Sequence, residues 1–275
     1  MQLIKDFSID PFLRTIWVSA EAKKTWESAI RDCADLVSEL ELLSVAKEQR
    51  KCGWQSISIQ QLPSFEKRCA EMGLTTLIVR YSAPLDGFAH KFQPVTKIDN
   101  NTNTPVIFAK KLEDALNYRR AYEVGNHDAQ GEFLGFPICC RQFFNWVWPD
   151  YYDPIGQIKD KDNPHPFSNP LLRYIGLRLS FHIPCSFHCE KTIEIGKQRM
   201  SLAKEIDPNL AMLLEALLSM PMSWDVKGGI AVVRTPIFYI ITSSVPSAEK
   251  YLVEIKGNFY PKESAKGIIF PFKRE

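Results

Sequence analysis

The sequence lacks a pronounced excess of charge of either sign. Its 34 lysine and arginine residues nearly balance its 32 aspartate and glutamate residues, which leaves a formal net charge of +2 over 275 residues. Nucleic-acid-binding domains usually present a clustered positive excess. Bulk electrostatics therefore gives no reason to expect a nucleic-acid partner, and we interpret the short basic end at 272–275 as solvated surface.

A long uninterrupted apolar run is also missing. Residues 1–17 contain Lys5, Asp6, Asp10 and Arg14, which is not the pattern of a secretory signal peptide. No later stretch approaches the ~18 apolar residues of a membrane-spanning helix. We therefore expect a soluble, cytoplasmic protein without a membrane partner. In that reducing compartment, seven cysteines indicate metal or redox chemistry rather than a disulfide framework.

The remaining composition is that of an ordinary globular protein. Hydrophobic residues make up 45% of the chain and charged residues 24%, which is enough to build a sizeable core. Apolar residues at helical spacing predict a long amphipathic helix from Glu21 to about Val45. Strands and helices alternate over roughly residues 50–110, and short β-rich stretches follow residue 222.

These patterns predict an α+β or mixed α/β fold. A small N-terminal α/β region is expected at residues 1–110. Residues 111–275 are expected to form a cysteine-bearing domain with a helical centre and a C-terminal antiparallel β-meander, although the two regions can equally belong to one continuous domain. The proline-rich segment 149–170 is irregular, and the sequence leaves open whether it is a lid or a surface loop.

Four of the seven cysteines lie in two short stretches, LGFPICCRQFF at 134–144 and FHIPCSFHCEK at 181–191. They are Cys139, Cys140, Cys185 and Cys189. Pro137 is well placed at the first position of a helix, which puts the adjacent pair in its first turn. Ser186 is expected to be the N-cap of a second helix, with one cysteine directly before it and the other at the third helical position.

All four cysteines are thus predicted at helix N-termini. There the helix dipole and the free backbone N–H groups lower thiol pKa values and favour thiolates, the form that binds metals. A single cysteine is more often a core residue than a ligand, and Cys33 and Cys69 lie on apolar helix faces as core residues do. Cys52 has no comparable setting. Two pairs at two helix starts instead predict one metal site with all four cysteines as ligands.

The sequence favours an iron–sulfur cluster of the 4Fe-4S type at this site, with zinc as the alternative. Structural zinc usually takes C-x₂₋₄-C pairs, and Cys185 and Cys189 form a C-x₃-C pair. Adjacent cysteines suit zinc less well, because neighbouring side chains at a helix start point in different directions, whereas a four-iron cube has more widely spaced corners. The C-x₃-C-x₂-C triad of radical S-adenosylmethionine enzymes is missing, since Thr192 stands in place of its third cysteine.

Three polar residues near the two stretches are candidate catalytic groups. His182 and His188 flank the second cysteine pair, where a histidine can donate a proton to a substrate or a hydrogen bond to sulfur. Glu132 lies shortly before the first pair and can reach the same site. Aromatic residues crowd the sequence around that pair, as expected for a water-excluding wall that binds a flat or apolar substrate.

The two stretches together resemble an uncharacterised prokaryotic family, the domain of unknown function numbered 483. The family pattern is L-G-[YF]-P-x-C-C-x-x-F followed by H-x-P-C-S-x-x-C, and both halves are matched here by GEFLGFPICCRQFF and FHIPCSFHCEKTIEIG. The resemblance covers about residues 105–245 and leaves out the N-terminal third. It implies a shared four-cysteine site and carries no activity that can be transferred.

Three functions are compatible with this site. The first is an iron–sulfur enzyme, an oxidoreductase or lyase, whose partners are a small-molecule substrate and an electron donor; a modified nucleoside or a tRNA stays open as the substrate. The second is a zinc-stapled binding module without catalysis. The third is a redox protein that cycles between dithiol and disulfide. Cys185 and Cys189 would be its better couple, because a disulfide between adjacent cysteines is strained.

Overall fold

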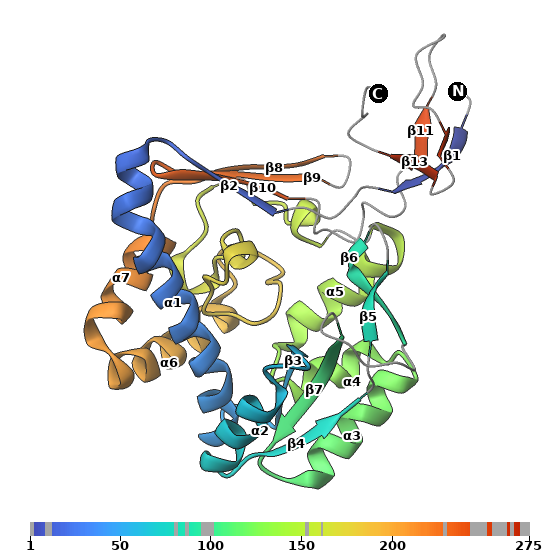
Figure 1. Cartoon of the computed structure of the whole chain (residues 1–275), viewed down its shortest axis with the longest axis vertical. Helices are drawn as coiled ribbons and strands as arrows, with labels where there is room; N and C mark the ends of the chain where they lie inside the picture. The colour runs from blue at the N-terminus through green and yellow to red at the C-terminus, as the bar shows by residue number, and fades with distance from the viewer. Residues whose placement is uncertain are drawn as a thin grey trace.

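The computed structural model describes most of the chain as helices and three β-sheets (Figure 1). The described residues are 3–8, 13–79, 82–85, 88–94, 102–151, 154–160, 162–227, 230–242, 252–254, 263–264 and 267–269. Their α-helices are α1 (Ala20–Ala46), α2 (Leu62–Glu71), α3 (Leu112–Glu123), α4 (His127–Phe133), α5 (Ile138–Tyr151), α6 (Glu190–Ile206) and α7 (Pro208–Leu218). Within the described ranges, no helix combines the length and apolarity needed to cross a membrane. The predicted mixed α+β fold is confirmed.

The sheet in the first half of the chain contains the predicted α/β layer. Its strands are β3 (Cys52–Ser58), β4 (Thr75–Ile78), β5 (Ser82–Leu85), β6 (Phe88–Pro94) and β7 (Asn103–Ala109). Both β3 and β4 run antiparallel to β7, on its two sides. They are therefore parallel to each other, and α2 joins them as the crossover of a β-α-β unit into which β7 is inserted. Gly73, with a φ of +70°, follows α2 in the left-handed conformation that ends many helices.

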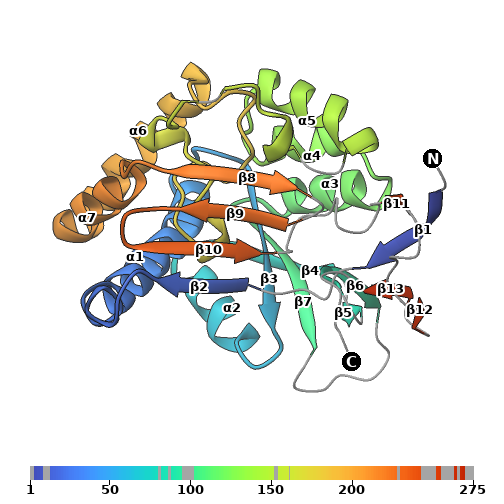
Figure 2. The same ribbon diagram turned by 90° about the horizontal axis from the view of Figure 1, so that it is seen from above.

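The predicted C-terminal meander forms a second sheet. β8 (Ser223–Lys227), β9 (Ile230–Arg234) and β10 (Phe238–Thr242) pair antiparallel in chain order. β2 (Leu13–Trp17), from the N-terminal end, pairs antiparallel with the other side of β10 (Figure 2). Because β2 occupies that edge, the next β-rich stretch does not extend the meander.

A third, small sheet contains this next stretch. β11 (Leu252–Glu254) pairs with β1 (Leu3–Ser8), whose other edge pairs with β13 (Gly267–Ile269), followed by β12 (Glu263–Ser264). The last of the β-rich stretches after residue 222 therefore lies outside the meander. The two N-terminal strands β1 and β2, which sequence patterning does not indicate, both pair with C-terminal strands.

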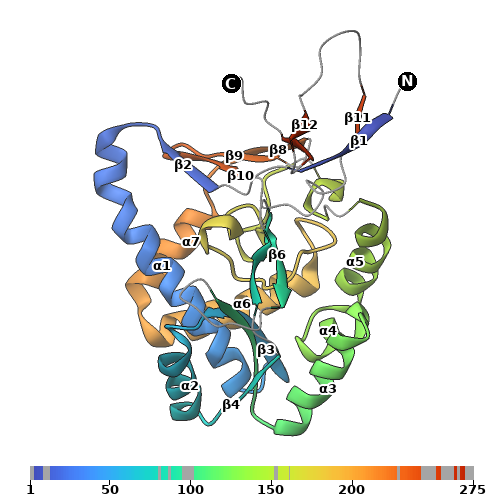
Figure 3. The ribbon, with the colours of Figure 1, turned by 45° about the vertical axis from the view of Figure 1, so that its right-hand side comes forward.

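The main hydrophobic core joins the two ends of the chain. The apolar stripe of α1, which includes Cys33, Val37 and Leu40, is buried in the same cluster as residues of α6, α7, β9 and β10. Figures 1 and 3 show α1 running alongside α6 and α7. A helix of the expected N-terminal region thus shares its core with the expected C-terminal region, and the division at residue 110 stays a prediction.

The proline-rich segment 149–170 is largely packed into this core where it is described. It contains two short 3₁₀ helices, η1 (Ile155–Gln157) and η2 (Pro166–Ser168). Ile155 and Ile158 belong to the main core, and the Asn169 side-chain amide donates to the Leu218 carbonyl in α7 at 2.9 Å. Most of the described side chains in this segment are thus buried or partly buried, so it packs against the helices rather than forming a solvated loop.

A helix cap and a glycine turn set the direction of the two helices α4 and α5 that lead to the first cysteine pair. Asn126 caps α4 by accepting a hydrogen bond from the Ala129 N–H at 3.0 Å. Gly135 follows α4 with a φ of +71°, and a Cβ there would meet the Arg50 Cβ at 2.9 Å. A larger residue would be strained in that conformation and crowded in that space, so Gly135 lets the chain reverse between α4 and α5.

Candidate metal centre

The first cysteine pair lies where the sequence predicts it. After the Gly135 turn and Pro137, α5 begins at Ile138, so Cys139 and Cys140 occupy its first turn. Their sulfurs are 3.9 Å apart. The expectation that adjacent cysteines suit zinc less well, because their side chains point in different directions, does not hold here, because both sulfurs turn to the same side of the helix start.

The second pair is held differently from the prediction. α6 begins at Glu190 and its N-cap is Cys189, not Ser186. The Ser186 hydroxyl donates to Asp160 Oδ2 at 2.6 Å and accepts from the His188 N–H at 3.0 Å. Since the Phe187 side chain is fully buried in the main core, the chain turns inward at 185–188 and enters the helix only afterwards.

Asp160 anchors this turn from the proline-rich segment. Its Oδ2 also accepts from the Phe187 N–H at 2.6 Å. The hydrogen bond from the Ser186 hydroxyl, followed by that from Phe187 and by the charge of His188, lowers the pKa of Asp160 against the opposing effect of partial burial. An ionised carboxylate thus holds the loop that carries Cys185.

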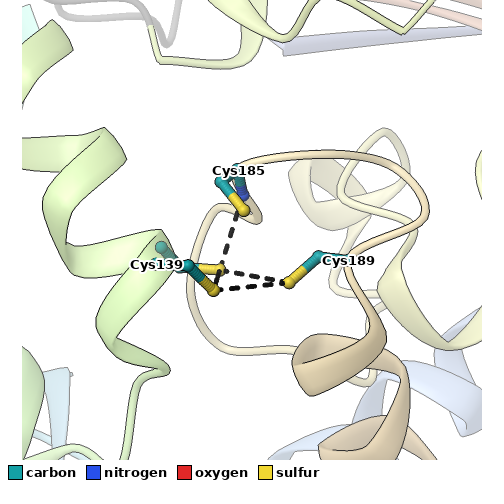
Figure 4. Close-up of side chains that lie close together, drawn as sticks. Cys139, Cys185 and Cys189 are labelled. Atoms are coloured by element: carbon teal, nitrogen blue, oxygen red, sulfur yellow. Dashed lines mark hydrogen bonds between the residues drawn. The ribbon is translucent and has the colours of Figure 1, made fainter.

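The four sulfurs converge on one point, as predicted. Cys189 Sγ lies 3.7 Å from Cys139 Sγ and 3.7 Å from Cys140 Sγ. All four ligand atoms, with that of Cys185 included, lie within 4.8 Å of one another. Figure 4 shows Cys139 reaching in from α5, while Cys185 and Cys189 reach in from the loop and the start of α6. The arrangement can hold a metal ion.

A series of polar contacts links the Cys140 sulfur to buried side chains behind the cluster. The Cys185 N–H donates to Cys140 Sγ at 3.4 Å, and Thr192 Oγ1 lies 3.4 Å from the same sulfur. His182 Nε2 is in turn 2.9 Å from Thr192 Oγ1. His182 is 8% exposed. The Thr192 hydroxyl lies between its ring and the Cys140 sulfur, so this candidate residue does not contact the sulfurs directly.

The other two candidate catalytic residues lie on the surface. The His188 side chain is exposed, and the exposed Glu132 carboxylate pairs with Arg141 at 3.4 Å. Within the described part of the chain, neither side chain forms a hydrogen bond to a cysteine sulfur. Their catalytic roles stay predictions, as does that of His182.

Burial and hydrogen bonding act in opposite directions on the thiols. Burial raises the pKa of Cys140, and burial together with the neighbouring Cys189 and Cys139 raises the pKa of Cys185 to about 12. Burial also acts to raise the pKa of Cys189, but bonds from Thr192, Cys140 and Cys139 outweigh it and lower that pKa. The expected ease of ionisation at helix starts therefore holds for Cys189, whereas burial favours the protonated thiols of Cys140 and Cys185 in the absence of a cation.

The remaining cysteines are core residues, as expected for Cys33 and Cys69. Each of the three is fully buried, in three different clusters of the core. Burial, the largest effect, raises the pKa of Cys33 to about 11 and that of Cys52 and Cys69 to about 12. None of them belongs to the metal-ligating group found among the described residues.

Two residues of the centre had no recognised role in the sequence. Thr192 was notable only as the position of an absent third cysteine, although its place three residues after the N-cap Cys189 is where a first-turn side chain reaches back to the cap. Asp160 lies far from both cysteine stretches in an irregular segment. No local pattern connects it to Ser186.

The chain matches no protein-family model, no curated protein and no solved structure. The resemblance to the domain of unknown function numbered 483 therefore stays a prediction from the two motifs.

Proposed function

We propose that Cys139, Cys140, Cys185 and Cys189 bind one metal ion of the zinc type, which fastens the start of α5 to the loop that enters α6. The observation that carries this proposal is the spacing of the sulfurs. Zinc–sulfur bonds of about 2.3 Å in a tetrahedron put neighbouring sulfurs about 3.8 Å apart. The three sulfur pairs formed by Cys139, Cys140 and Cys189 are separated by 3.7, 3.7 and 3.9 Å, and the Cys185 sulfur lies within 4.8 Å of all three.

A four-iron cube needs a wider set of ligands. Each of its thiolates binds a different iron at a different corner, so the sulfurs lie further apart than around a single ion. The sequence favours such a cluster, whereas the compact sulfur set supports the zinc alternative. Iron bound alone by the four sulfurs is compatible with the same spacing, since a tetrahedral S₄ set suits either metal.

The ligand set supports a structural role rather than catalysis at the metal. Structural zinc sites are closed by four protein ligands, whereas catalytic sites keep one position for water or substrate. The four cysteines here would supply all four ligands of a tetrahedral ion. The N–H of Cys185 and the hydroxyl of Thr192 then offer hydrogen bonds to a sulfur that carries negative charge. We therefore propose a metal-stapled binding protein.

Metal and sulfide analysis of the purified protein tests the proposal. Samples prepared with and without oxygen should both contain one zinc, or one iron, per chain and no acid-labile sulfide. A brown anaerobic sample with iron and sulfide in equal amounts, several of each per chain, would establish the iron–sulfur cluster instead. A metal-free protein whose thiol titre changes by two upon reduction would establish the dithiol–disulfide function.

A further inference from the structure

A cavity of about 200 Å³ lies directly beside the metal centre. Its wall includes Cys140, so a molecule bound there would contact the back of a metal ligand. The other lining residues that matter here are Phe136, Phe144, Phe181, Arg141, Arg173 and His182. The cavity has no part in binding the metal, and its role is independent of which metal the cysteines hold.

Two arginines give the cavity a positive wall with unused hydrogen-bonding capacity. Arg141 uses one terminal nitrogen for Asp128 and Glu132, but its Nε is buried without a partner. Arg173 is partly buried at the wall, and no carboxylate pairs with it among the described residues. Neither of the two acidic partners of Arg141 is among the lining residues. A bound anion could therefore accept hydrogen bonds from both guanidinium groups.

A second layer of arginines lies behind the same wall. Arg50, Arg178 and Arg199 approach the Phe181 ring with their guanidinium carbons 4.8, 5.5 and 3.9 Å from its centroid. Glu41 lies 3.8 Å from Arg50 and 4.0 Å from Arg178, so one carboxylate faces three cations. Burying cations without enough negative charge is costly. An anion in the cavity would reduce that cost.

The rest of the wall is apolar and aromatic, which limits the kind of anion. Phe136, Phe144 and Phe181 line the cavity and would leave a bare inorganic ion without contacts on most of its surface. A dry cavity of about 150 Å³ accommodates a benzene ring, so the volume of about 200 Å³ here suits one ring that carries a carboxylate. The buried His182 Nδ1, which also lacks a partner, adds a polar position to the same wall.

We propose that this cavity binds a small aromatic carboxylate, with its carboxylate at Arg141 and Arg173 and its ring against the three phenylalanines. The proposal goes beyond the metal-stapling function, because it assigns a ligand class to a site that the metal does not occupy.

Calorimetric titration of the purified, metal-containing protein tests the ligand class. The probes are benzoate, benzyl alcohol as its neutral counterpart, and inorganic phosphate. Benzoate should bind at least roughly tenfold more tightly than benzyl alcohol, because hydrogen bonds to a charged group are the stronger ones. Equal affinity for benzoate and benzyl alcohol, tighter binding of phosphate than of benzoate, or no benzoate binding would each overturn the proposal.

A pair of arginine variants tests the location. Arg173→Gln should weaken benzoate binding about tenfold and leave benzyl alcohol binding unchanged. Arg178→Gln, which removes an arginine from the second layer and not from the cavity wall, should change benzoate affinity less than threefold. Equal losses in both variants would contradict a specific site. Metal content and circular dichroism, measured on each variant, distinguish a loss of benzoate binding in the cavity from a loss of the metal centre. If Arg173→Gln does not fold, the comparison of benzoate with benzyl alcohol on the wild type decides the proposal.

Discussion

At the scale of single residues, Cys140 makes several of the contacts that hold the candidate centre together. Its sulfur contacts Cys139, Cys189, Thr192 and the Cys185 N–H. Burial makes its thiolate unfavourable in the absence of a cation, since it raises the pKa of the thiol. The same burial stabilises the bound state once a metal replaces the proton, because water cannot compete for the ligand.

Replacing any one of the four clustered cysteines by serine should abolish stoichiometric metal binding, because a hydroxyl is a poor substitute for a thiolate at a tetrahedral sulfur site. The controls are Cys33→Ala, Cys52→Ala and Cys69→Ala. These should keep a full complement of metal and lose about 1 kcal/mol of unfolding free energy each, since they only shorten a buried side chain. Metal analysis and urea unfolding of all seven variants measure both effects. Metal loss in a control variant would contradict the assignment of the ligands.

Thr192→Val should weaken metal binding by about 10- to 100-fold, the usual effect of removing a group that orients a metal ligand. The substitution deletes the hydroxyl between His182 and Cys140 but keeps the shape of the buried side chain. Thr242→Val is the matched control, because Thr242 is equally buried in β10. Competition with a coloured chelator measures both affinities, and similar losses in the two variants would show a general effect of stability.

At the level of elements, the turn at 185–188 determines whether the two halves of the centre meet. It has no regular hydrogen-bond ladder, and it is held by the buried Phe187 side chain and by two hydrogen bonds to Asp160. The Phe167–Asn169 region lies under it, and the Ser168 hydroxyl donates to the Phe187 carbonyl. The proline-rich segment thus acts as the support of the second cysteine pair.

Asp160→Ala should lower the melting temperature and weaken metal binding, while Asp162→Ala should have little effect, because the exposed Asp162 has no role in the turn. The pKa of Asp160 is lowered in the folded state. Its stabilisation is therefore present above the unfolded-state value of about 3.9 and is lost as the pH falls through the lower folded-state value.

Melting curves of the wild type and the two variants between pH 3 and pH 7 measure this dependence. The difference between wild type and Asp160→Ala should be largest at neutral pH and should shrink in acid. A difference that is independent of pH would show that the carboxylate charge does not hold the turn.

At the scale of the whole molecule, a bound metal would connect two groups of helices that are distant in sequence. α4 and α5 lie beside the sheet that contains β3 and β7, whereas α6 packs on α1 and α7 (Figures 1 and 3). The sulfurs lie between these two groups of helices. Loss of the metal should therefore loosen the junction between them more than either group alone.

Metal affinity should fall steeply as the pH decreases. Cys140 and Cys185 have raised pKa values without a metal, so binding must release their protons. With at least these two protons released, the apparent dissociation constant should rise by at least about 100-fold for each pH unit lost. Chelator competition at pH 6, 7 and 8 measures the slope, and an affinity that does not depend on pH would contradict binding through these thiols.

Local sequence patterns were enough to identify the four clustered cysteines and several elements. The long helix α1, the capped helix α4 and the first turn of α5 follow from periodicity, from Asn126 and from Pro137, because each depends on residues a few positions apart. Two cysteine pairs in two short stretches likewise predicted one metal site. The N-cap of α6 was misplaced, since Ser186 has the right chemistry but its hydroxyl bonds Asp160 instead.

Contacts between distant segments required the tertiary structure. Nothing in the N-terminal residues indicates that β2 pairs with β10, and nothing near Asp160 indicates that it holds Ser186. The same is true of the distances between sulfurs, on which the proposal of a single ion rather than a four-iron cube rests. The sequence by itself determined which cysteines form the site, because thiol chemistry and helix starts are local properties. Packing decided how closely they approach, since that distance depends on the core into which Phe187 and the flanking helices are buried.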